Sequence, residues 1–74
     1  MADRTTLYTF GDCALCADAR ADLERRSAAY TEIDLRAHPE RIPELLKLTR
    51  GRRVVPVIVT GTRIEIAPGG GRAF

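Results

Sequence analysis

The hydrophobic and polar positions of the chain form a short series of patterns, each typical of one kind of secondary structure. β-Branched and aromatic residues dominate three stretches, and a fourth alternates apolar with charged residues, as strands do. In two other stretches apolar residues recur at intervals of three and four, the period of a helix with one buried face. These patterns predict strands over residues 5–10, 30–35, 54–59 and 63–66 and helices over residues 13–27 and 42–50.

Residues at the ends of the two helices support these assignments. Asp12 is placed to cap the first helix, since aspartate is favoured at that position. Pro43 fits the first turn of the second helix, and Gly51 is suited to close it. Each helix has one apolar face that is expected to meet the sheet: Leu15, Ala19 and Leu23 in the first, and Ile42, Leu45, Leu46 and Thr49 in the second.

The order of elements is β-α-β-α-β-β, which predicts an α/β protein with the core of the thioredoxin fold. The first two strands are joined through a helix and should be parallel, and the last two should form an antiparallel hairpin. The result is a four-stranded mixed sheet in one domain over residues 1–74.

Residues 68–74 show no periodicity, and three consecutive glycines resist helix formation, so a C-terminal helix is expected to be absent. The sheet face beside the first helix should then stay apolar and open, and either a second copy of the chain in a homodimer or Phe74 folding back is expected to cover it. The alternative is a flatter, more polar face that tolerates water, which the alternating residues 63–66 leave open.

Composition and charge narrow the classes of function. The chain has 74 residues, 45% of them hydrophobic and 30% charged, with a net charge of +2. A nucleic-acid-binding domain usually carries a larger and more clustered positive charge. No apolar run approaches the roughly 20 residues that cross a membrane, and no apolar signal segment begins the chain, so we expect a cytoplasmic protein without a membrane partner.

The chemistry of the chain is concentrated in Cys13 and Cys16. Cys13 falls at a strand-to-helix junction, where free N–H groups and the helix dipole favour a thiolate. We predict that Cys13 attacks a substrate disulfide and that Cys16, one turn later and less exposed, resolves the mixed disulfide. The negative charge of Asp12 opposes the thiolate. The alternative, two buried and inert cysteines, is disfavoured because the pair lies within a β-α-β pattern.

Pro56 interrupts an otherwise good strand and is the second informative residue. We predict a cis Val55–Pro56 bond facing the cysteines, which leaves the Val55 backbone free to pair with a substrate strand. The alternative is an ordinary trans proline at the start of a strand.

These motifs, in this order, resemble the glutaredoxin family. The resemblance rests on Leu7-Tyr8-Thr9, Cys13-Ala14-Leu15-Cys16, residues 30–35 and 44–49, and Val54-Val55-Pro56 with Gly61. It implies that Cys13 is the nucleophile, Cys16 the resolving thiol and Pro56 the cis-proline. We expect the substrate to contact Phe10, Asp12, Leu15 and Val55.

Several positions depart from the family pattern. Phe10 replaces a lysine that binds the glutathione carboxylate, and the Gly-Gly-x-Asp segment is missing after Ile64. The chain is similar in this respect to a short bacterial glutaredoxin-like branch that includes selenocysteine-containing proteins, and to redoxins that serve ribonucleotide reductase.

The predicted function is that of a thiol-disulfide oxidoreductase that transfers electrons to protein or small-molecule disulfides. It needs no resident cofactor, and either glutathione or a donor of the thioredoxin-reductase type would reduce it.

The alternative is a small Cu(I)-binding, metallochaperone-like module, because two thiolates suit Cu(I). A closed zinc site needs four ligands, which two cysteines and one histidine do not supply. The cluster of Arg50, Arg52 and Arg53 is interpreted as a helix C-terminus stabilised by cations. The alternative is an anchor for an acidic partner or for the glutathione carboxylate.

Overall fold

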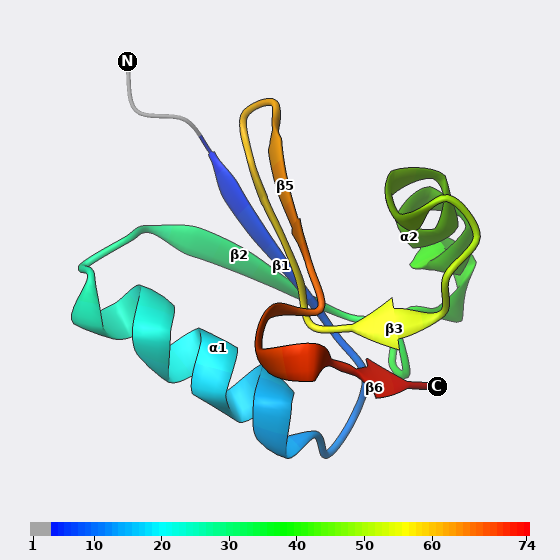
Figure 1. The fold of residues 1–74 in the computed structure, drawn as a ribbon, viewed down its shortest axis with the longest axis horizontal. Coiled ribbons are helices and arrows are strands. Elements are labelled where there is room, and N and C mark those ends of the chain that lie inside the picture. The colour runs from blue at the N-terminus through cyan, green and yellow to red at the C-terminus, as the bar shows by residue number, and fades with distance from the viewer. Residues whose placement is uncertain (1–3) are drawn as a thin grey trace.

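The computed structural model describes residues 4–74, and its centre is a mixed four-stranded sheet in the order β2-β1-β4-β5 (Figure 1). The sheet and its two helices have the architecture of the thioredoxin fold. In chain order the elements are β1 (Thr5–Thr9), α1 (Ala14–Arg25), β2 (Tyr30–Asp34), a short 3-10 helix (Pro39–Arg41), α2 (Ile42–Thr49), β3 (Val54–Val55), β4 (Val57–Thr60), β5 (Arg63–Ile66), a second 3-10 helix (Pro68–Gly70) and β6 (Arg72–Ala73).

The pairing of the strands agrees with the predicted topology. β1 runs parallel to β2 with Thr5 opposite Tyr30, and antiparallel to β4 with Thr5 opposite Thr60. β4 and β5 form the antiparallel hairpin. β1 therefore lies inside the sheet with a partner on each side.

Two apolar layers cover the two faces of this sheet. Leu7 of β1 and Ile58 of β4 pack against Ala19 and Leu23 of α1. On the other face Tyr8 and Val57 pack in a cluster that includes Leu45 of α2. Consecutive residues of a strand point to opposite faces, so α1 and α2 lie on opposite sides of the sheet. Leu15, in the first turn of α1 near the cysteines, lies beside Ala19 and Ile58 and also packs against the cluster of Tyr8 and Val57.

The ends of α2 follow the predicted rules with one change. Pro43 lies in the first turn, as expected. The residue that turns the chain out of the helix in the left-handed conformation is Arg50, with a φ of 57°, and Gly51 follows with a φ of 89°. The Gly51 N–H donates to the Leu46 carbonyl at 2.8 Å, which satisfies one of the last helical carbonyls. Leu48, not Leu46, is the further leucine that packs against the core.

The segment predicted as one strand over residues 54–59 is divided at Pro56. The Val55–Pro56 bond is cis, as predicted, and separates β3 from β4. β3 leaves the main sheet and pairs antiparallel with β6, with Val54 opposite Ala73 and Val55 opposite Arg72. The sequence analysis assigned no element to the tail, where the structure has a short 3-10 helix and β6. A two-residue strand is too short to show any period in the sequence.

The predicted open apolar face beside α1 is also wrong. Ile58 stands opposite Glu65 on that face, so β5 presents a polar side chain beside α1. The exposed large apolar residues are Ile64 and Ile66, at 41% and 37% exposure, and they lie in register with Val59 and Val57 on the α2 face. Apolar and charged side chains alternate along β5 as predicted. Its register with β4 decides which of the two sets faces α1.

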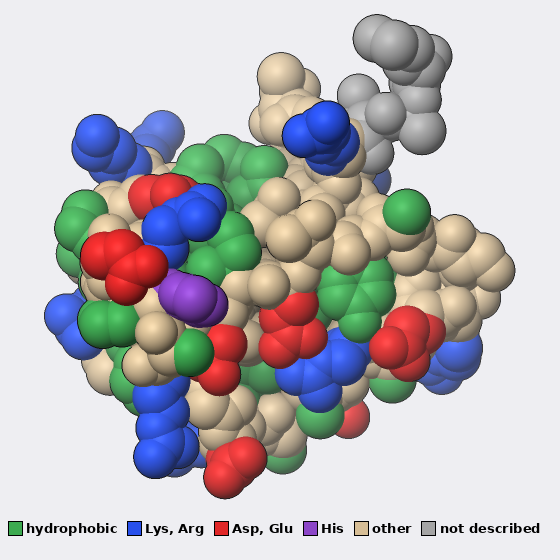
Figure 2. Space-filling view, turned by 180° about the vertical axis from the view of Figure 1, so that it is seen from behind, with side chains coloured by type: hydrophobic (Ala, Val, Ile, Leu, Met, Phe, Trp, Pro, Cys, Tyr) green, Lys and Arg blue, Asp and Glu red, His purple; other side chains and the backbone are tan. Residues whose placement is uncertain are grey.

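Acidic and basic side chains lie next to one another over the face shown in Figure 2. Ion pairs such as Arg20–Glu32 and Arg41–Glu44 join side chains of opposite charge. In the part of the chain that the structure describes, no helix is long and apolar enough to cross a membrane.

Leu45 gives a direct test of the core on the α2 face. Its side chain is fully buried, so Leu45→Ala should lower the free energy of unfolding by about 2–5 kcal/mol. Urea denaturation followed by circular dichroism measures the change. Ile64→Ala is the matched control, because this exposed side chain should cost far less; equal effects of the two substitutions would contradict the described packing.

Candidate active site around Cys13 and Cys16

The loop between β1 and α1 holds the first cysteine in place. The Asp34 carboxylate, at the end of β2, accepts hydrogen bonds from the backbone N–H groups of Gly11 and Arg36, both at 2.9 Å. These bonds, the one from Gly11 first, lower the pKa of Asp34 below its usual range. Gly11 has a φ of 54°, and a Cβ there would lie 2.8 Å from the Arg36 side chain. Glycine at this position therefore lets the loop turn close to β2.

Cys13 is the N-cap of α1. Its backbone is extended, and its Sγ accepts a hydrogen bond from the Cys16 backbone N–H at 3.2 Å. Asp12 was predicted to be the cap, and this prediction was wrong, because the helix begins one residue later and the cysteine sulfur takes the acceptor position. The sulfur thus lies where the unpaired N–H groups and the positive end of the helix dipole meet.

The two thiols have different surroundings. Both are free, and Cys13 is 9% exposed whereas Cys16 is 1% exposed, which confirms that Cys16 is the less accessible of the two. Burial, together with the neighbouring Cys13 thiol, raises the pKa of Cys16 to about 12. At neutral pH Cys16 is therefore a protonated thiol unless its surroundings change.

Val55 and Pro56 lie close to the cysteine pair. Val55 is buried in the same apolar cluster as Cys13 and Cys16, and Pro56 is also buried. The structure thus brings together the two motifs that the sequence analysis singled out, although about forty positions of the sequence separate them.

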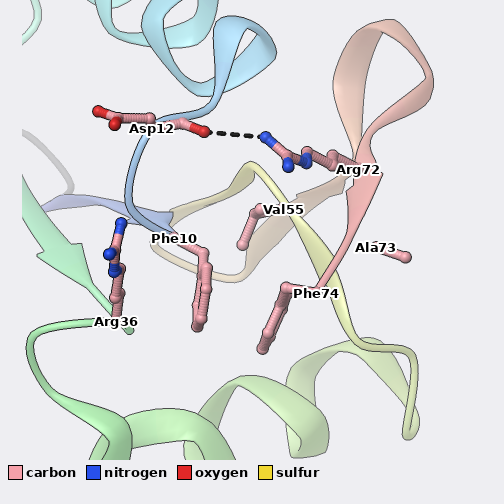
Figure 3. A pocket seen from close by; sticks show the side chains of 7 residues that line it. All are labelled: Phe10, Asp12, Arg36, Val55, Arg72, Ala73 and Phe74. Atoms are coloured by element: carbon pink, nitrogen blue, oxygen red, sulfur yellow. Dashed lines mark hydrogen bonds between the residues drawn. The ribbon is translucent and has the colours of Figure 1, made fainter.

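A pocket opens beside this cluster (Figure 3). Three of the predicted contact residues, Phe10, Asp12 and Val55, line it. Leu15, the fourth, is absent from its lining and packs against the cysteine cluster instead. The pocket also contains residues that the sequence analysis did not assign to the site: Arg36, Arg72, Ala73 and Phe74.

Phe74 folds back, but onto the site and not over the sheet face beside α1 where it was expected, and it stacks on Phe10. The ring centroids are 4.8 Å apart and the planes are inclined by 18°, and Figure 3 shows the two rings side by side. The Arg53 guanidinium lies 4.9 Å from the centroid of the Phe74 ring, and its Nε donates to the Phe74 carbonyl at 3.1 Å. Arg53 thus has a structural role, which the helix-end interpretation of the arginine cluster did not include.

The backbone of Val55 is not free. β6 occupies the edge of β3, with Arg72 opposite Val55, so the expectation of an open edge for a substrate strand was wrong for this conformation. The only sequence signal for this arrangement is a single aromatic residue, Phe74, after the glycines. The flexibility of three glycines allows such a return without indicating where it ends.

The residues the structure describes include no group of three or more His, Cys, Asp or Glu side chains that could hold a metal ion. The two thiols are therefore without a further ligand of these types beside them.

Comparison with known proteins agrees with this geometry. The sequence matches the family model described as Glutaredoxin over residues 5–64. Among solved structures, the chain is similar to NrdH-redoxin from Escherichia coli, described as a glutaredoxin-like protein with a thioredoxin-like activity profile. The TM-score is 0.70 and the sequence identity 31%, over 84% of this chain and 79% of that one. A search of curated proteins finds no match.

These findings support thiol-disulfide redox chemistry in general, and none of them favours the Cu(I)-binding alternative. On its sequence, its fold and its cysteine pair, the chain belongs to the glutaredoxin family.

Proposed function

We propose that this protein reduces disulfide bonds through the dithiol of Cys13 and Cys16, with Cys13 as the attacking thiolate. The observation that carries the proposal is the position of the Cys13 sulfur at the N-terminus of α1, where it accepts the Cys16 N–H at 3.2 Å. The Cys16 N–H and the positive end of the dipole of α1 are both directed at this sulfur.

The reaction proceeds in two exchanges. The Cys13 thiolate attacks one sulfur of the substrate disulfide, so that a mixed disulfide forms and the other substrate sulfur leaves as a thiolate. Cys16 then loses its proton and attacks the Cys13 sulfur. The second substrate sulfur leaves, the Cys13–Cys16 disulfide forms, and two electrons have passed to the substrate. A donor must return two electrons before the next cycle.

The burial of Cys16 assigns it the second step. A thiol with a pKa near 12 is a poor nucleophile at neutral pH, so it does not compete with Cys13 for the substrate. Formation of the mixed disulfide removes the thiol of Cys13, which is one of the groups that raise this pKa. The resolving thiol thus becomes easier to deprotonate when it is needed.

The substrate is proposed to contact the residues that surround the pair. Phe10, Asp12 and Val55 line the pocket beside the cysteines, and Leu15 packs against their cluster. Pro56 completes the catalytic group as the buried residue that follows Val55.

We propose that the electron donor is a dithiol reductase of the thioredoxin-reductase type and that the protein works in the reducing cytoplasm. Phe10 supports this choice, because it stands where the resemblance to glutaredoxins implies a lysine for the glutathione carboxylate. The positive charges in the pocket lining come instead from Arg36 and Arg72. The similar Escherichia coli protein is described by its thioredoxin-like activity profile.

A reduction assay tests the donor. The oxidised protein is supplied with NADPH and either thioredoxin reductase or glutathione with glutathione reductase, and NADPH consumption is followed with a disulfide substrate. We expect turnover with thioredoxin reductase and little with glutathione. Efficient turnover with glutathione alone would overturn the proposed donor, and no turnover with either would count against the oxidoreductase itself.

Substitution of each cysteine separates their roles. Cys13→Ser should abolish reduction of a protein disulfide, because no accessible thiolate remains. Cys16→Ser should still form the mixed disulfide and stall there, which mass spectrometry detects as a covalent adduct. An adduct on Cys16 in the Cys13→Ser variant, with none on Cys13 in the Cys16→Ser variant, would reverse the assignment.

The pH dependence of Cys16 follows from its raised pKa. In the Cys13→Ser variant the contribution of the Cys13 thiol is lost, but burial, the first cause of the raised pKa, remains. Below the pKa the thiolate fraction rises about tenfold per pH unit, so iodoacetamide should alkylate Cys16 of this variant slowly at pH 7 and progressively faster beyond pH 9. An ordinary cysteine, with a pKa of about 8.5, would approach its plateau there. Circular dichroism at each pH shows whether the fold persists, and a plateau below pH 9 in the folded protein would contradict the described burial.

A further inference from the structure

The pairing of β6 with β3 places the tail of the chain along the strand that leads into Pro56. Phe74 donates its backbone N–H to the Arg53 carbonyl at 3.1 Å, and the Ala67 N–H donates to the Pro56 carbonyl at 2.9 Å. Between these two bonds Arg72 and Ala73 run antiparallel to β3. The tail therefore occupies the backbone edge of β3 beside the cysteine pair.

Glycine allows the tail to approach this closely. Gly71 has a φ of 70°, and a Cβ there would lie 2.3 Å from the Cβ of Ala67 and 3.3 Å from the Val55 carbonyl. A side chain at this position would push the tail away from β3.

The tail is also fixed to the loop that carries Cys13. Arg72 Nη1 donates to the Asp12 carbonyl at 2.9 Å, and Figure 3 shows this bond between two residues that line the pocket. Phe74 stacks on Phe10 and packs against the apolar cluster that contains Cys13 and Val55. Cys13, in that same cluster, is 9% exposed.

The contacts that hold the tail are each of modest strength, so a competing peptide can replace them. Arg72 and Ala73 are exposed, and a two-residue strand pair has little stability of its own. The ring stack and the exposed hydrogen bonds each contribute modestly. An extended peptide could replace each contact with an equivalent one, as in other cases where a peptide adds a strand to a sheet edge.

We propose that residues 72–74 are an internal strand that closes the site, and that the substrate is an extended, disulfide-bearing segment that displaces it. Such a segment pairs with Val55 in the place of Arg72 and sets an aromatic side chain on Phe10 in the place of Phe74. The part of this proposal that concerns the substrate rests on the oxidoreductase function proposed above. The closure of the site by the tail does not.

Alkylation of Cys13 measures the closure without any disulfide exchange. In a Cys16→Ser background, the plateau rate of reaction with iodoacetamide at high pH reports access to the sulfur independently of its pKa. Phe74→Ala should raise this rate roughly two- to tenfold, the factor that corresponds to the loss of one aromatic stack. Arg72→Ala, which removes the bond to Asp12, should change the rate in the same direction by a smaller factor.

Ile64→Ala is the matched control, because it removes an exposed apolar side chain from β5 and should leave the rate unchanged. Circular dichroism verifies that each variant is folded. Rates for both tail variants equal to that of the control would overturn the closure.

A peptide added in solution tests the substrate part. Acetyl-Gly-Arg-Ala-Phe-amide, which copies the tail, should slow the alkylation of the Phe74→Ala variant at millimolar concentration, and acetyl-Gly-Arg-Ala-Ala-amide should slow it less. Equal effects of the two peptides would overturn the aromatic preference. Faster alkylation of the tail variants in a protein that reduces no disulfide would retain the closure and refute the oxidoreductase function.

Discussion

Burial of β1 on both faces is the constraint on which the rest of the structure depends. Leu7 and Tyr8 are adjacent and both buried, and their side chains point to opposite faces of the sheet. Leu7 therefore joins the layer with α1, and Tyr8 joins the layer with α2, where its hydroxyl donates to Glu44. Because β1 has a strand partner on each side, its last residue is fixed in space, and the loop to Cys13 starts from a rigid point.

The different chemistry of the two cysteines follows from this placement. Cys13 ends the loop and caps α1, so its sulfur meets the unpaired N–H groups of the first turn. Cys16 lies inside that turn and faces the core, where loss of hydration favours its neutral form. One helical turn thus separates the Cys13 sulfur at the helix N-terminus from the buried Cys16 sulfur. In the proposed reaction the first attacks the substrate and the second resolves the mixed disulfide.

The tail pairs with the edge of β3 beside the candidate site, an edge that would otherwise be unpaired. β3 follows α2 and leads into Pro56, and it has no partner in the main sheet. β6 satisfies its edge, and Phe74 covers the apolar cluster around Val55 with the help of Phe10 and Arg53. An unpaired edge beside an apolar surface favours association with other chains. In the proposed closure, the same contacts that protect this edge also limit access to Cys13.

The sequence by itself determined the order and kind of the main elements, the position of Cys13 at a helix start and the importance of Pro56. These features depend on periodicity and residue preference within a few neighbouring positions, which a linear sequence records. Only the tertiary structure decided that the cysteine itself caps α1 instead of Asp12, that β5 turns Glu65 toward the α1 face, and that the tail pairs with β3. The bond between Arg72 and Asp12 joins residues sixty positions apart. Such contacts form because packing brings distant segments together, and the local sequence of neither segment indicates its partner.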